Sequence, residues 1–376
     1  MNIKLIKFID KYIGFVLCFL LGIVNILFIK KKYSANKILI LQFWGVGETI
    51  LTLPAINALK KRYPKSNISL LCTKRNQDVY FENEAVEKLI VNELNPAAIM
   101  MFILKNFKKY DLVIDFEEYL NISALIAFFT GRYSTGFSGQ IRSNLYNKKV
   151  RYNDNQHVVL THLDLIRLVD VKDVPNSLIR LNYSKKDKMN CDKLLIEHNI
   201  TQKHYLIGFG AGLAESAKSR RWPKDKYAKL AAALYKNNSK FLFFGMEEEK
   251  ALIEEIIMLI NNKTVIDNCI NLAGKSTLRE AFYLIEKCRL FISNDTGTLH
   301  IAAAQGVKTV GLYGPNLPLR WGPVGEGNIS IYKGKICKYS PCINVHKGQV
   351  PECRFGQDNK CMKAIKVDEV LKLIKF

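Results

Sequence analysis

Acidic residues are scarce in this chain, and arginine-rich tracts are absent. Its 376 residues include 34 Asp and Glu against 56 Lys and Arg, so the formal net charge is +22 at pH 7. This surplus favours an anionic partner such as a nucleic acid, an acidic membrane or a phosphorylated substrate. The lysines are spread along the whole chain, however, and no aromatic-basic RNA motif accompanies them, so we expect no nucleic-acid binding. The alternative is that the positive charge reflects a generally lysine-rich composition in a protein that lies next to an anionic membrane surface.

The chain also lacks a small-residue cleavage site behind its apolar N-terminal run, which argues against a removed signal peptide. Residues 13–29 (IGFVLCFLLGIVNILFI) carry no charge, and lysines lie on both sides of them. A run of 17 residues is at the short end of what spans a bilayer. We therefore expect residues 1–33 to form a membrane-associated helix, which either spans the bilayer or lies in its interface. We expect the basic remainder of the chain to face the cytoplasm.

After residue 33, apolar strands alternate with helices in two series, and the hydrophobic content of 48% is sufficient for two ordinary cores. Continuous apolar runs, typical of strands buried on both faces, occur at 37–42, 68–72, 112–116, 205–209, 241–244, 264–266, 290–293 and 308–313. Helices are expected at 48–63, 224–236, from about 247, and at 277–287. The polar segment 171–188 is typical of a linker. The pattern predicts an α/β fold of two Rossmann-like, doubly wound domains facing a cleft, at residues 34–178 and 179–362.

Residues 290–315 (LFISNDTGTLHIAAAQGVKTVGLYGP) are the most informative segment. A buried strand leads into a turn with Asp295, Thr296 and Gly297, and a short helix and a second strand follow. Such a strand–turn–helix exposes backbone N–H groups and a positive dipole end, which suit a phosphate or diphosphate. Asp and Thr are also ordinary helix-capping residues, so capping alone is the alternative interpretation.

Four segments in order resemble one known family: KILILQFWGVGETILTLPAINALKKRYP, IGFGAGLAESAKSRRWPKDKYAKLAAAL, NLAGKSTLREAFYLIEKCRLFISNDTGTLHIAAA and VGLYGPNLPLRWGP. The set resembles glycosyltransferase family 9, the heptosyltransferases of lipopolysaccharide core synthesis. The resemblance implies a GT-B architecture, with the acceptor bound mainly by residues 34–178 and a nucleotide sugar, usually ADP-heptose, by residues 179–362. It implies inverting transfer to an anionic, lipid-linked saccharide at the cytoplasmic face of the inner membrane, with no cofactor required.

The family's catalytic base is the aspartate of a Gly-Asp pair in the first strand–helix turn, and this chain has Gly47 and Glu48 there. By resemblance, Glu48 is therefore the candidate base that takes the proton of the acceptor hydroxyl. The alternative is that Glu48 only stabilises the helix N-terminus. Gln42 is a second departure, because many members carry a basic residue at that position.

The donor-binding residues follow from the same resemblance. Arg220, two residues before Trp222, corresponds to the family's phosphate-binding basic residue, and Lys218 is a substitute for it. The predicted donor set comprises Gly210, Ala211, Gly212, Lys218, Arg220, Glu247, Glu248, Asp295, Thr296, Gly297 and His300. Glu247 or Glu248 would hold the ribose hydroxyls, and both are alternatively helix-start acids.

Acceptor contacts are predicted at Gly45 and Gly47 in the first turn, and at Arg132 and Arg142 in the basic stretch that follows residue 131. A basic face would suit the phosphorylated and carboxylated sugars of an inner core. Exposed arginines are also common on surfaces that bind nothing.

Nine cysteines occur, and four of them cluster as Cys337, Cys342, Cys353 and Cys361. Four thiolates in a short segment are the ligand set of a structural zinc site, and free structural thiols are the alternative. A reducing compartment argues against disulfides. Beyond them, residues 363–376 are predicted to form a C-terminal helix that is amphipathic over 367–376, and the resemblance to GT-B proteins implies that it packs back on the N-terminal domain.

Overall fold

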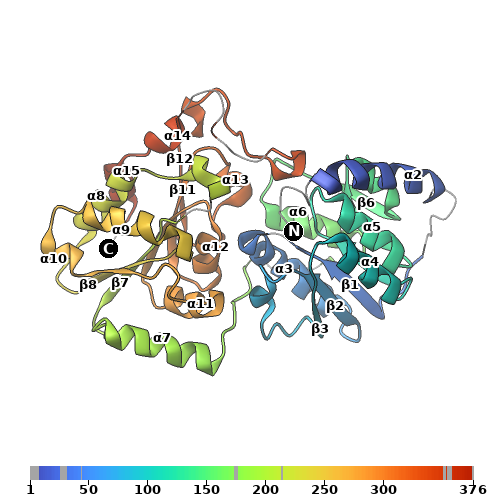
Figure 1. The fold of residues 1–376 in the computed structure, drawn as a ribbon, viewed down its shortest axis with the longest axis horizontal. Coiled ribbons are helices and arrows are strands. Elements are labelled where there is room, and N and C mark those ends of the chain that lie inside the picture. The colour runs from blue at the N-terminus through green and yellow to red at the C-terminus, as the bar shows by residue number, and fades with distance from the viewer. Residues whose placement is uncertain are drawn as a thin grey trace. The chain divides into compact units, whose positions relative to one another are not determined.

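The computed structural model describes residues 8–25, 32–43, 45–172, 177–212, 215–349, 353 and 358–374. The chain divides into two compact units, which are described separately here (Figure 1). Unit 1 consists of Met1–Asn176 with Val345–Lys347, and unit 2 of Ser177–Asn344 with Gly348–Phe376. The boundary falls within the predicted linker, of which residues 173–176 lie outside the described ranges.

Unit 1 is built on a six-stranded, fully parallel sheet in the order β3-β2-β1-β4-β5-β6. Its central strands are buried on both faces, as the uninterrupted apolar run KILIL of β1 requires. The strands are β1 (Lys37–Leu41), β2 (Asn67–Cys72), β3 (Lys88–Val91), β4 (Leu112–Asp115), β5 (Ser134–Ser138) and β6 (Lys148–Arg151). The order reverses between β1 and β4, and this places a ligand-binding position at the carboxyl ends of these two strands.

Helices cover both faces of this sheet. The unit contains η1 (Asp10–Gly14), α2 (Phe15–Asn25), α3 (Val46–Arg62), η3 (Gln77–Tyr80), α4 (Pro96–Lys105), α5 (Asn121–Thr130), η4 (Ile141–Leu145) and α6 (Val158–Arg167). The short turn η8 (Val345–Lys347) also belongs to it, because the His346 ring stacks on Tyr152 and its carbonyl accepts a hydrogen bond from Gln140 Nε2 at 2.6 Å.

Unit 2 repeats the same topology, with a parallel sheet in the order β12-β11-β10-β7-β8-β9. Its strands are β7 (Tyr205–Gly210), β8 (Ser239–Phe243), β9 (Cys269–Asn271), β10 (Leu290–Asn294), β11 (Lys308–Tyr313) and β12 (Ile329–Tyr332). The strand order reverses between β7 and β10, so the equivalent ligand-binding position lies at their carboxyl ends. Two doubly wound α/β units, as predicted, are therefore present.

The helical segments of unit 2 include one that the sequence analysis assigned wrongly. They are α7 (Lys185–Glu197), η5 (Glu215–Arg220), α8 (Lys224–Leu234), η6 (Glu247–Glu249), α9 (Lys250–Met258), α10 (Lys263–Ile266), α11 (Leu278–Glu286), α12 (Gly297–Ala304), α13 (Pro318–Trp321), η7 (Gly334–Ile336), α14 (Lys360–Lys363) and α15 (Val367–Leu373). The predicted strand 264–266 is the helix α10, because the Asn262 side chain caps it by accepting from Val265 N, and the strand follows at Cys269.

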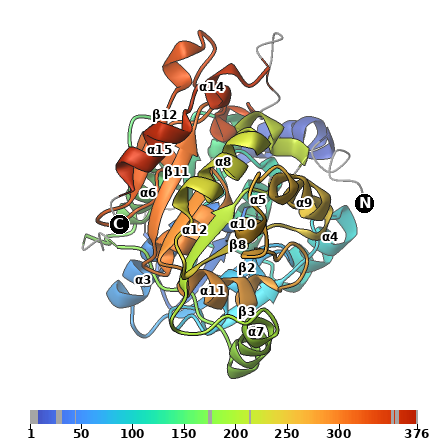
Figure 2. The same cartoon turned by 90° about the vertical axis from the view of Figure 1, so that its left-hand side faces the viewer.

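The C-terminal helix packs within unit 2. α15 lies beside α8, as Figures 1 and 2 show. Val370 and Ile374 are buried in the unit 2 core, and Glu369 pairs with Lys333 at 2.5 Å. The apolar side of this helix is thus covered by its own unit.

The N-terminal apolar run is helical over α2, and residues 26–29 of the run lie outside the described residues. Cys18, Gly22 and Asn25 of α2 are buried against unit 1. Within the ranges that the structure describes, no helix combines the length and hydrophobicity needed to cross a membrane. The spanning form of the prediction is therefore not supported.

The core of unit 1 contains one histidine whose protonation opposes folding. The His162 ring is buried, its Nδ1 lies 3.3 Å from Leu51 O, and the Phe116 ring packs edge-on at 5.5 Å. Burial lowers the pKa of His162 from 6.5 to about 4. Below pH 6.5, therefore, the unfolded chain binds a proton on His162 that the folded chain does not bind. The contribution of His162 to the free energy of unfolding is fully present above pH 6.5 and is lost as the pH falls towards 4.

We expect this group to remove up to about 3 kcal/mol from the free energy of unfolding between pH 7 and pH 4. Denaturant titrations of the wild type and His162→Gln at several pH values in this window measure the effect. The variant should show a shallower pH dependence, whereas His204→Gln, a change at a half-buried histidine of unit 2, should leave the slope unchanged. Equal slopes in all three proteins would contradict the assignment.

Candidate functional site

The first candidate site lies in unit 1, where the strand order reverses between β1 and β4. The turn after β1 carries Glu48, in the first turn of α3. Gly45, the residue before α3, has φ +60°, and a Cβ there would lie 2.7 Å from Glu48 Oε2. The Glu48 side chain thus folds back over the turn towards the helix N-terminus, where the helix dipole favours a carboxylate. Gly45 is needed both for its backbone conformation and for the space that Glu48 occupies.

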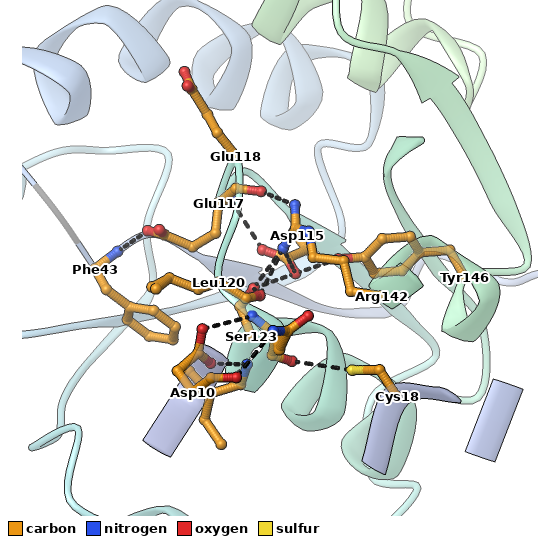
Figure 3. A network of polar contacts seen from close by, with 12 residues as sticks. Asp10, Cys18, Phe43, Asp115, Glu117, Glu118, Leu120, Ser123, Arg142 and Tyr146 are labelled. Carbon is orange, nitrogen blue, oxygen red and sulfur yellow. Dashed lines mark hydrogen bonds and ion pairs between the residues drawn. The ribbon is translucent and has the colours of Figure 1, made fainter. Parts of the chain in front are cut away.

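A group of carboxylates that the sequence analysis did not single out lies beside this turn. Three buried carboxylates lie at the end of β4: Asp115 is its last residue, and Glu117 and Glu118 come shortly after it. Phe43 N, at the end of β1, donates to Glu117 Oε1 at 2.5 Å (Figure 3). The run DFEE at the end of the strand predicted at 112–116 was the available signal, because carboxyl ends of neighbouring parallel strands meet at one edge.

Glu117 differs electrostatically from an ordinary glutamate. Burial raises its pKa well above the usual range, the Phe43 N–H lowers it in part, and the neighbouring Asp115 and Glu48 carboxylates raise it further. Because the Glu48 charge contributes to the raised pKa of Glu117, the two carboxylates lie close enough to interact.

Arg142, a predicted acceptor contact, lies in the interior of unit 1. Its side chain is fully buried and donates to Leu120 O at 2.8 Å and to Ser123 Oγ at 2.9 Å, and it also bonds to Glu117 O (Figure 3). It forms an ion pair with Asp115 at 3.4 Å. This placement favours a structural role in holding the end of β4, and not the predicted contact with an acceptor.

Arg132 is exposed but lies at the other edge of the sheet. It precedes β5, its Nε donates to Lys108 O at 3.0 Å, and Asp111 is 3.8 Å away. In a parallel sheet, residues before a strand lie at the amino edge, whereas Glu48 lies at the carboxyl edge. The structure therefore brings Gly45, Gly47 and Glu48 together in one turn and leaves Arg132 away from it.

The second candidate site lies in unit 2, at the carboxyl ends of β7 and β10. Asp295 is buried after β10, and Arg220 Nη1 donates to its carbonyl at 2.9 Å and lies 3.4 Å from its carboxylate. Asn316 Nδ2 donates to the same carboxylate oxygen at 2.8 Å. The predicted phosphate-binding arginine and the predicted sugar-binding aspartate are thus brought into direct contact, although 75 residues separate them.

The adjoining turn places polar groups at the start of α12. Thr296 and Gly297 are half-buried, and Thr296 Oγ1 lies 2.8 Å from Thr298 Oγ1 and 3.0 Å from Ser293 Oγ. Ser293 Oγ donates to Gly210 O at 3.1 Å, which joins the ends of β7 and β10. The α12 N-terminus supplies backbone N–H groups and a positive dipole end, so the turn suits an anionic group. His300 of the same helix is buried.

The glutamates after β8 divide into two kinds. Glu247 and Glu248, the predicted ribose ligands, are exposed. Glu249 is buried, and Met246 N donates to its Oε2 at 2.7 Å. A Cβ on Gly212 would lie 2.1 Å from that oxygen, so the Glu249 carboxylate lies against the predicted donor loop. Burial raises the pKa of Glu249, with Arg221 opposing the shift. Glu249 is thus a further candidate, and no pattern in the sequence indicated it, because Met246 is not the Ser or Thr that a capping-box pattern requires.

The four clustered cysteines line one pocket of about 170 Å³ in unit 2, together with Ser219 of the donor loop. Asn359 N donates to Cys353 Sγ at 3.2 Å, and Asn359 Nδ2 donates to the carbonyl of Lys218, whose side chain is exposed. Among the described residues, no three metal-ligating side chains lie close enough to hold a metal ion. The zinc site therefore stays a prediction.

Comparisons with known proteins indicate the family. The model of glycosyltransferase family 9 (heptosyltransferase) matches residues 104–347. The chain is 30% identical over 310 residues to lipooligosaccharide heptosyltransferase 2 of Haemophilus ducreyi, covering 78% of this chain and 88% of that protein. It is 28% identical to lipopolysaccharide heptosyltransferase 2 of Salmonella typhimurium, covering 75% and 84%.

Solved structures show the same fold. The glycosyl transferase family 9 protein from Veillonella parvula superimposes with a TM-score of 0.77 at 23% identity, covering 91% of this chain and 97% of that one. The ADP-heptose lps heptosyltransferase II of E. coli gives a TM-score of 0.70 at 23% identity, covering 90% and 97%.

The two Rossmann-like units have a GT-B-like fold. The family model and the heptosyltransferase relatives make the protein an enzyme of the glycosyltransferase class. The family match extends over most of the chain and includes both the unit 2 site and the end of β4. The chain belongs to glycosyltransferase family 9.

Proposed function

We propose that this enzyme transfers heptose from ADP-heptose to a lipopolysaccharide core or another lipid-linked saccharide at the cytoplasmic face of the inner membrane. The contact between Arg220 and Asp295 at the diphosphate-type turn carries the proposal, since it joins a phosphate-binding and a sugar-binding group in one site. The heptosyltransferase relatives support the choice of sugar. A different nucleotide sugar on the same fold is the rival function.

In the proposed reaction, Glu48 accepts the proton of the acceptor hydroxyl as its oxygen attacks the anomeric carbon of the donor. The bond from that carbon to the diphosphate breaks on the opposite face, so the configuration inverts. Arg220, Lys218 and the N-terminus of α12 stabilise the negative charge that collects on the leaving diphosphate. Asp295 orients the sugar by accepting hydrogen bonds from its hydroxyls. This scheme uses side chains and backbone dipoles alone and requires no metal.

Calorimetric titration of the full-length protein with ADP, UDP and GDP tests the donor assignment. We expect selective ADP binding, and Arg220→Ala should weaken it by about 10- to 100-fold, because a hydrogen-bonded charge contributes about 1.5–3 kcal/mol. Arg289→Ala is the matched control, since Arg289 precedes β10 at the opposite edge of the same sheet. Preference for UDP or GDP would discard ADP-heptose, and absence of all binding would favour a non-catalytic binding protein.

A further inference from the structure

Unit 1 carries an exposed apolar surface that the two candidate sites do not explain. We call it the α2–α4 face and define it by Ile13, Val16, Leu20 and Ile23 of the N-terminal helices and by Leu104 and Phe107 at the end of α4. Each of these side chains is 53–70% exposed. α2 and α4 both pack against α5 in one hydrophobic cluster, and Figures 1 and 2 show the three helices side by side.

The orientation of α2 is fixed by its opposite side. Gly14 and Gly22 lie so close to unit 1 that an added Cβ would be 2.9 Å from the Cβ atoms of Asn121 and Asn144. Asn25 Nδ2 donates to Asn144 O at 2.8 Å, and Cys18 is fully buried. These small and polar residues recur every three to four positions, so they form one side of the helix. The large apolar residues are consequently held outwards, and α2 forms part of unit 1.

The exposed charged side chains within η1, α2, α4 and α5 are all basic. The helices α2, α4 and α5 contain no acidic residue. Asp10, the one acid of η1, is turned inwards, where Asn121 N and Ile122 N donate to its carboxylate at 3.2 and 2.7 Å. Lys11, Lys105 and Lys109 are exposed at the ends of the helices. The face thus combines outward apolar side chains with a cationic border.

We propose that the α2–α4 face docks on an anionic lipid bilayer, with its apolar side chains inserted among the acyl chains of one leaflet. Apolar side chains with a lysine border are the features that bind an amphipathic helix to an anionic interface. A second copy of this chain is a poorer occupant, because it would oppose lysines with lysines. A position of α2 across the bilayer is incompatible with its packing, because one side of the helix is buried against the rest of unit 1.

The inference is independent of the donor sugar, and flotation of the full-length protein with vesicles tests it. We expect binding to phosphatidylethanolamine vesicles that contain phosphatidylglycerol, and weak binding to pure phosphatidylcholine. The triple variant Val16→Gln, Leu20→Gln, Ile23→Gln should lose at least about tenfold in vesicle affinity, since each change removes an inserted apolar side chain. The double variant Lys105→Gln, Lys109→Gln should lose about fivefold per lysine, for the anionic vesicles alone.

The matched control is Met189→Gln, Ile196→Gln, Met258→Gln, three equally exposed apolar positions on unit 2, and it should bind as the wild type does. Hydrogen exchange adds a readout that does not depend on variants: the amides of α2 and α4 should become protected when vesicles are added. Equal losses in the control, unchanged binding of the α2 triple variant, or equal affinity for neutral vesicles would overturn the proposal. A lipid-free dimer that the α2 triple variant abolishes would assign the face to a second copy instead.

Discussion

Glu48→Gln is expected to lower the rate of glycosyl transfer by about 10²- to 10⁴-fold, the range that a positioned general base contributes. The amide keeps the size of the side chain and its place over Gly45 but cannot accept the proton of the acceptor hydroxyl. Nucleotide affinity should stay unchanged, because the donor residues belong to unit 2. Steady-state transfer assays with ADP-heptose, combined with ADP titration of the same protein, measure both quantities.

Two further variants distinguish a base from a helix-stabilising acid. Glu84→Gln, at an exposed acid of unit 1, controls for the loss of one negative charge and should leave the rate unchanged. Glu48→Asp restores the acid usual in the family but shortens the reach of the carboxylate. A large gain in turnover would mark Glu48 as a degraded base, and a loss would show that this site is built for the longer side chain. Full activity of Glu48→Gln would exclude it as the base and direct attention to Glu117.

Glu117 should influence the pH dependence of the reaction more than its rate near neutrality. In the variant Glu117→Gln, the glutamine imitates the protonated carboxyl group that the raised pKa of Glu117 favours. Its amide oxygen can still accept the hydrogen bond from Phe43 N.

The position of Glu117 beside the turn after β1 depends on the topology of the sheet. The order of the strands places the ends of β1 and β4 side by side, but periodicity alone does not reveal which strands are neighbours.

Much of the fold could be predicted because buried parallel strands leave a direct trace in the sequence. The strand at 308–313 has the predicted bounds, and Thr277 caps the helix predicted to begin there. The strand predicted at 264–266 was wrong. Its β-branched residues favour a strand, but the preceding Asn262 cap and the local chain geometry determine a helix. The packing partners of the two chain ends could not be predicted from periodicity: α15 lies beside α8 within unit 2, and α2 packs against α5 within unit 1.

In the candidate sites too, some residues could be predicted from the sequence and others could not. Glu48 and Asp295, which follow predicted strands, lie where parallel-sheet topology places ligands, and Arg220 contacts Asp295. The burial of Arg142 could not be predicted, because its stretch of sequence is polar and basic, a pattern that normally indicates a surface. Its burial depends on Asp115, Ser123 and Tyr146, which are brought together only by the folded chain.

Arg142→Met is accordingly expected to lower the free energy of unfolding by about 3–5 kcal/mol, the usual cost of removing one partner from a buried ion pair. The change would leave the Asp115 carboxylate buried with only the Ser123 and Tyr146 hydroxyls, each 2.6 Å away, and the Glu117 N–H as donors. The carbonyls of Glu117 and Leu120 would also lose their guanidinium donors. Urea titration followed by circular dichroism measures the difference.

Arg132→Met controls for the loss of an arginine near the same strand, and because that side chain is exposed it should change stability by about 0.5 kcal/mol or less. The double variant Arg142→Met, Asp115→Asn should recover part of the loss, since it removes the uncompensated charge along with its partner. A surface arginine that contacts an acceptor would behave in the opposite way: its replacement would leave unfolding unchanged and raise the KM for the acceptor. Stability and KM together therefore decide whether Arg142 supports the end of β4 or binds the acceptor.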